Sequence, residues 1–137
     1  MNKVPPKPAR ASYVSKASAP KAKILYCEDD SSVLSAQARA FEKAGYAVER
    51  VEGRKAAEQA LHAGSYDVVV LGHTLTKDDR HHLPYMAKKG SRDTRVLVLH
   101  ASGKHPAVDW ALDSREGDEA VLTALASLAE YRLAIAG

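Results

Sequence analysis

Apolar runs of strand length alternate with amphipathic segments along most of this chain. ILYC (24–27), DVVVL (67–71) and RVLVLH (95–100) are short and almost wholly apolar, which is typical of strands buried on both faces. YAVERV (46–51) alternates apolar and polar positions, as a strand nearer a sheet edge does, and AVDWAL (107–112) is the last candidate strand. The pattern therefore predicts five strands.

Apolar positions at helical spacing fill the intervals between these strands. One helix is predicted between the capping residues 30–32 and Gly45, and a second spans residues 54–62. A weaker helix is expected around residues 82–88, and a final one covers residues 118–134. Strands that alternate with helices pair in parallel through right-handed crossovers, so we expect an open, doubly wound α/β sheet.

Composition narrows the class of protein. The 137 residues are 45% hydrophobic, which suffices for one packed core without disulfides or metal staples. Cys27 is the only cysteine, so a secreted disulfide scaffold is excluded and a cytoplasmic location is the simplest expectation. No apolar run approaches the length of a membrane span, and no membrane partner is expected.

The formal net charge of +3 is unevenly distributed. Residues 1–23 contain lysines and arginine but no acidic residue, whereas the remainder is mildly acidic. Residues 1–22 are also rich in Pro, Ala and Ser, so we expect a disordered basic tail before a domain that covers residues 23–137. The tail is either a solubilising leader or a segment that binds nucleic acid or anionic lipid weakly through its positive charge. Its spread charges form no patterned surface, so nucleic acid is not an expected partner.

Ligands of doubly wound sheets bind at the carboxyl ends of the strands. The residues expected at that edge are Glu28, Asp29 and Asp30 after the first strand, Gly72 and His73 after the third, His100 after the fourth and Asp113 after the fifth.

Three segments carry a resemblance to a known family. KILYCEDD, FEKAGYAVERVEG and YDVVVL resemble the receiver domain of two-component response regulators, and the resemblance covers roughly residues 22–130. It implies a flavodoxin-like sheet of five parallel strands in the order 2-1-3-4-5. Only twelve residues separate His100 from Asp113, so the fourth helix of the family is expected to be reduced or absent.

The family's phosphorylation chemistry is only partly represented. In receivers, two acidic residues after the first strand bind Mg²⁺ together with an aspartate at the tip of the third strand, which accepts a phosphoryl group from a histidine kinase. Glu28 and Asp29 match the acidic pair. Gly72 stands at the position of the acceptor, His100 at that of a Thr or Ser, and Asp113 at that of a Lys, so these three do not match.

These departures predict a pseudo-receiver. Glycine cannot be phosphorylated, Mg²⁺ loses a carboxylate ligand, and Asp113 would repel a phosphoryl group that lysine would bind. We expect a stand-alone, phosphorylation-independent protein-interaction module in bacterial signal transduction, without a cofactor, whose partner is a histidine kinase or another signalling protein. No Gly-rich phosphate loop, nucleophile elbow or catalytic triad is present in the sequence, so an enzyme is not expected.

Two alternatives remain open. Glu28, Asp29, His73, His100 and Asp113 could form a metal- or pH-responsive pocket, because mixed carboxylate and imidazole ligands suit Zn²⁺ better than Mg²⁺. The metal set would be Glu28, Asp29 and His100. The second alternative is a phosphorylatable regulator with a displaced acceptor, Asp78 or Asp79.

Overall fold

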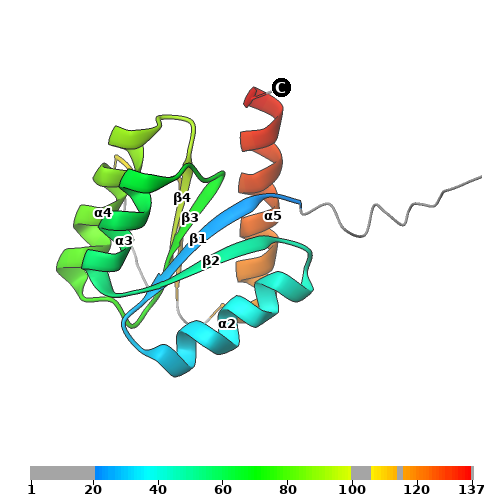
Figure 1. The fold of residues 1–137 in the computed structure, drawn as a ribbon. Coiled ribbons are helices and arrows are strands. Elements are labelled where there is room, and N and C mark those ends of the chain that lie inside the picture. Colours follow the sequence, from blue (N-terminus) through cyan, green and yellow to red (C-terminus); the bar gives the residue numbers. More distant parts are fainter. Residues whose placement is uncertain (1–20, 100–105, 114–115, 137) are drawn as a thin grey trace, which may run out of the picture.

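Five parallel strands form the centre of the molecule (Figure 1). The computed structural model describes residues 21–99, 106–113 and 116–136, so all but the last two residues of the predicted tail lie outside the described part. The sheet order is β2-β1-β3-β4-β5, which confirms the prediction. The strands are β1 (Lys23–Glu28), β2 (Ala47–Glu52), β3 (Val68–Leu71), β4 (Arg95–Leu99) and β5 (Trp110–Leu112).

Helices cover both faces of this sheet. They are α2 (Ser31–Lys43), α3 (Gly53–Ala63), α4 (Lys77–Gly90) and α5 (Gly117–Ala136). Helices α2 and α5 pack on one face and α3 and α4 on the other (Figure 1). Within the described ranges, no helix combines the length and apolar character that crossing a membrane requires.

The central strand β1 is buried on both faces, as its apolar run predicts. Ile24 and Tyr26 point into the core beneath α2 and α5, whereas Leu25 and Cys27 point into the core beneath α3 and α4. Burial, followed by nearby carboxylates, raises the pKa of the Cys27 thiol to about 12, so this cysteine is an inert core residue. The same alternation turns Glu28, two residues after Tyr26, toward the side of α2 and α5.

Helix α4 is longer than its sequence pattern indicates. It begins at Lys77 because the Thr76 side chain caps it, accepting a hydrogen bond from the Asp79 amide at 3.1 Å. Asp78 and Asp79 in the first turn favour the same start through the helix dipole. Pro84 lies inside the helix and is buried, which weakens the helical signal of this segment without ending it.

The prediction of a reduced fourth helix is not confirmed. The described residues form four helices, and residues 100–105, which open the connection between β4 and β5, lie outside the described part of the chain. The last strand is shorter than the predicted range 107–112, because Pro106 and Ala107 belong to a turn and pairing begins at Trp110.

A polar network around Asp109 anchors this short strand. The Asp109 carboxylate accepts hydrogen bonds from the Val96 amide at 2.7 Å, from Lys88 Nζ at 2.6 Å and from the Arg95 guanidinium at 3.1 Å. Lys88 Nζ also donates to the Thr94 carbonyl at 2.7 Å. The network therefore joins the end of α4, the start of β4 and the approach to β5.

Replacing Asp109 by alanine should destabilise the domain by about 1 kcal/mol, because three donors lose one partly exposed acceptor. Urea unfolding of the variant and the wild type measures the difference. Glu42→Ala is the matched control, since Glu42 pairs with Arg50 on the surface, where its side chain is 41% exposed. Equal effects of the two substitutions would show that the Asp109 network does not anchor β5.

Candidate functional site

The tip of β3 has no room for a side chain at position 72. A Cβ atom added to Gly72 would lie 1.8 Å from Cδ of Glu28 and 1.9 Å and 2.1 Å from its two carboxylate oxygens. Such separations are far below van der Waals contact, so only glycine is compatible with this arrangement. The Glu28 carboxylate thus fills the space into which a side chain from position 72 would project.

Glu28 is fully buried, and its two oxygens are held by different groups. Oε1 accepts hydrogen bonds from the Thr74 amide at 2.9 Å and from the Thr74 hydroxyl at 2.6 Å. Oε2 accepts a hydrogen bond from the Tyr26 hydroxyl. Burial, and then the bond to Glu28, raise the pKa of Tyr26, so the phenol remains a donor. These bonds offset the cost of removing the carboxylate from water.

Thr74 joins two loops at the carboxyl edge of the sheet. Its hydroxyl donates to Glu28 and accepts hydrogen bonds from the amides of Asp29 at 2.8 Å and Asp30 at 3.1 Å. The loop after β3 is therefore fastened to the loop between β1 and α2. Sequence reasoning missed Thr74 and Tyr26; the one available signal was the strand alternation that places Tyr26 and Glu28 on the same side.

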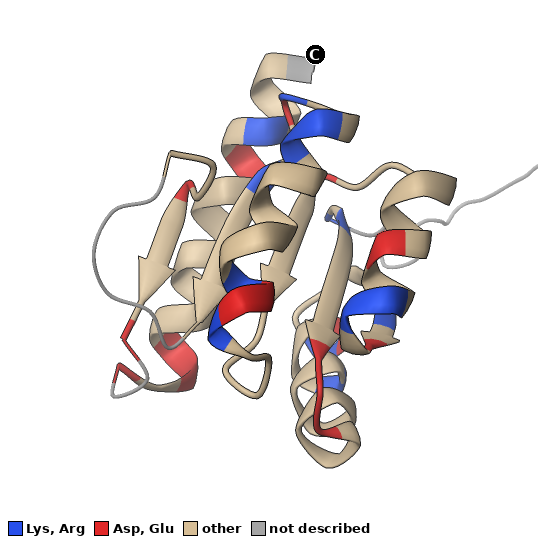
Figure 2. Ribbon diagram, turned by 90° about the vertical axis from the view of Figure 1, so that its left-hand side faces the viewer, with Lys and Arg blue, Asp and Glu red and all other residues tan. Residues whose placement is uncertain are grey.

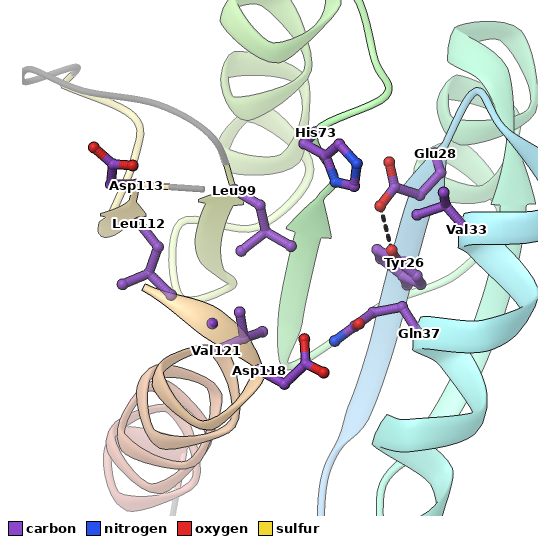
Figure 3. A pocket seen from close by; sticks show the side chains of 11 residues that line it. Tyr26, Glu28, Val33, Gln37, His73, Leu99, Leu112, Asp113, Asp118 and Val121 are labelled. Carbon is purple, nitrogen blue, oxygen red and sulfur yellow. Dashed lines mark hydrogen bonds between the residues drawn. The ribbon is translucent and has the colours of Figure 1, made fainter. Parts of the chain in front are cut away.

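A cavity of about 200 Å³ opens beside Tyr26 and Glu28 (Figure 3). Its apolar lining is Val33 of α2, Leu99 of β4, Leu112 of β5 and Val121 of α5. Gln37 and Asp118 extend into it from opposite sides, and His73 and Asp113 complete its polar lining (Figure 3).

The structure brings together three of the five predicted pocket residues. Glu28, His73 and Asp113 line the same cavity, whereas Asp29 does not, and His100 lies outside the described residues. Asp29 is exposed instead. Loss of part of its hydration raises the pKa of the Asp29 carboxyl. Repulsion from Asp79, Glu28 and Glu52 raises it further. Asp29 thus belongs to an acidic group at the start of α3 and α4 rather than to the cavity.

The described residues do not fit the Mg²⁺ site of a receiver. Both oxygens of Glu28 are engaged by Tyr26 and Thr74, and position 72 supplies no carboxylate. Within residues 21–99, 106–113 and 116–136, no three His, Cys, Asp or Glu side chains are placed to hold a metal ion. The predicted set Glu28, Asp29 and His100 stays a prediction, because His100 is not described.

Asp78 and Asp79, the alternative acceptors, lie in the first turn of α4 and do not line the cavity. The Asp79 carboxylate lies 3.7 Å from the Arg54 guanidinium. Neither residue replaces a side chain at the tip of β3.

Known proteins resemble this chain in sequence and in fold. The transcriptional regulatory protein BasR of Escherichia coli is 37% identical over 79 residues, which are 58% of this chain and 36% of BasR. This chain thus matches only about a third of the length of BasR. No family model matches the chain.

Solved structures with the same architecture include a CheY-like response regulator receiver domain protein from Methanospirillum hungatei. It has a TM-score of 0.70 and 14% identity, over 80% of this chain and 94% of that one. The response regulator TrrA from Thermotoga maritima, solved in complex with Mg²⁺ and BeF, has a TM-score of 0.67 and 17% identity, over 77% and 97% of the two chains. The chain therefore has the fold of response regulator receiver domains.

Proposed function

We propose that this domain is a pseudo-receiver that acts as a phosphorylation-independent protein-interaction module in bacterial signal transduction. The observation that carries the proposal is the position of Glu28, whose carboxylate fills the space beside Gly72 where receivers carry the acceptor aspartate. The sequence match to a transcriptional regulatory protein supports a role in signalling.

The electrostatics of the site also disfavour phosphoryl transfer. A phosphoryl group that approached the tip of β3 would meet the buried Glu28 carboxylate. Asp113 lines the same cavity, at the position where receivers use a lysine to bind the phosphoryl oxygens. In this proposal Glu28 takes the place of the acceptor and Asp113 that of the cation, and both are anions.

The hydrogen bonds of Thr74 favour a fixed binding surface over a switched one. Thr74 fastens the loop after β3 to the loop before α2 through hydrogen bonds within the chain. A partner, either a histidine kinase or another signalling protein, would therefore bind a surface that does not depend on phosphorylation.

The test is to incubate the purified protein with Mg²⁺ and acetyl phosphate or beryllofluoride, and to follow its intact mass and its amide NMR spectrum. We expect no added phosphoryl mass and no shifts around Glu28, Gly72 or Thr74, while an ordinary receiver domain treated in parallel responds to both reagents. Covalent phosphorylation, or shifts centred on the strand tips, would overturn the proposal. A zinc titration of the same sample then tests the metal-sensor alternative, which requires specific shifts at Glu28, Asp29 or His100.

A further inference from the structure

Acidic side chains gather at the carboxyl edge of the sheet. All four described helices begin here after an acidic N-cap residue or with an acidic first turn, which suits the positive end of the helix dipole. The acidic residues of this edge that are not fully buried are Asp29, Asp30, Glu52, Asp78, Asp79, Asp113, Glu116, Asp118 and Glu119. Among the described residues, the basic residues near them are Arg54, Lys55, Lys77 and Arg80.

The opposite, amino edge of the sheet is basic. Its lysines and arginines are Lys21, Lys23, Lys43, Lys88, Lys89, Arg92, Arg95 and Arg132. The acidic residues at this edge are Glu42, Asp67, Asp93, Asp109 and Glu130. Asp109 is paired with Lys88 and Arg95, and the Asp67 carboxylate lies 4.0 Å from the Arg132 guanidinium. Figure 2 shows Lys and Arg gathered where α4 and α5 end, and Asp and Glu in the connection where α5 begins.

The two ends also differ in shape. Helix α5 has 20 residues, about 30 Å at 1.5 Å per residue, whereas the strands beneath it are too short to match that length. Its last turns therefore extend past the amino edge (Figure 1), where Tyr131 is 54%, Leu133 46% and Ile135 43% exposed. At the carboxyl edge, the cavity has the apolar residues Leu99 and Leu112 in its lining and Asp118 beside them.

We propose that the amino edge of one copy of this chain docks on the carboxyl edge of a second copy. Basic side chains around an apolar projection would meet acidic side chains around a partly apolar cavity, so the two surfaces are complementary in charge. Because the two surfaces are different, each docked copy leaves one surface of each kind open, and the contact adds copies head to tail. This inference does not depend on the absence of phosphorylation.

The test uses the full chain and two charge reversals at exposed positions. Lys89→Glu with Arg92→Glu alters the amino edge, and Asp118→Lys with Glu119→Lys alters the carboxyl edge. Sedimentation measures the average mass at low ionic strength and again at about 0.5 M salt, where the Debye length falls below about 5 Å. We expect the wild type to reach about two-fold the monomer mass or more at low salt and to return to the monomer at high salt.

Each altered protein alone should remain monomeric at low salt, whereas a 1:1 mixture should associate, because the reversed charges then face opposite charges. Arg39→Glu, exposed in the middle of α2, is the control for a change of charge away from both edges and should associate as the wild type does. Thermal unfolding confirms that each variant is folded. A wild type that stays monomeric, or a dimer insensitive to salt and to both reversals, would overturn the head-to-tail contact and leave the phosphorylation test unaffected.

Discussion

Replacing Gly72 by alanine is expected to lower the free energy of unfolding by about 3 kcal/mol or more, an unusually large loss for the addition of one methyl group. The new Cβ would lie 1.8 Å from Cδ of Glu28, so the carboxylate must leave its position. Moving it breaks the bonds from Tyr26 and Thr74 and leaves buried polar groups without partners. Urea unfolding of the variant measures the loss.

Two comparisons separate this clash from a general cost of altering glycine. Gly90→Ala is the matched control, because a Cβ there would lie at an ordinary 3.9 Å from the Leu61 carbonyl, and alanine is the better helix former. In a protein that already carries Glu28→Ala, Gly72→Ala should cost much less, since the colliding carboxylate is gone. An equal cost of Gly72→Ala in both backgrounds would show that Glu28 is not the cause.

The same geometry bears on any attempt to place an acceptor carboxylate at position 72. An aspartate at position 72 begins with the same Cβ, so Gly72→Asp would meet the same obstruction before it could serve as an acceptor. It would also place a second carboxylate against a buried one, which is costly without a cation between them. The absence of a Cβ at position 72 and the inward Glu28 carboxylate therefore depend on each other, and we expect a substitution at position 72 alone to destabilise the fold.

The strands and their order could be predicted because burial on both faces leaves a direct trace in the sequence. The runs that form β1, β3 and β4 are continuous and apolar. The segments between them include stretches whose apolar residues recur at helical spacing. The limits of α4 and β5 were less predictable. Thr76 and the first-turn carboxylates start α4 ahead of its apolar spacing, and Asp109 turns its side chain to Lys88 and Arg95 instead of extending β5.

The candidate site shows a different limit. Gly72 could be recognised from its place at the end of an apolar run, but the sequence gives no sign of what fills the space beside it. That depends on the direction of Glu28, which is set by a phenol on its own strand and by a threonine 46 residues away. Residues that meet only through the fold leave no local spacing to detect.

Thr74→Val provides the second large effect, an expected loss of about 2 kcal/mol in the free energy of unfolding. Valine keeps the shape of threonine but removes the hydroxyl that donates to Glu28 and accepts from the amides of Asp29 and Asp30. Thr74→Ser, which retains the hydroxyl, should lose much less. If serine were destabilising and valine were not, methyl packing rather than the hydroxyl would hold the two loops together. If only valine is destabilising, the hydroxyl of this one side chain holds the two loops together at the tips of the strands.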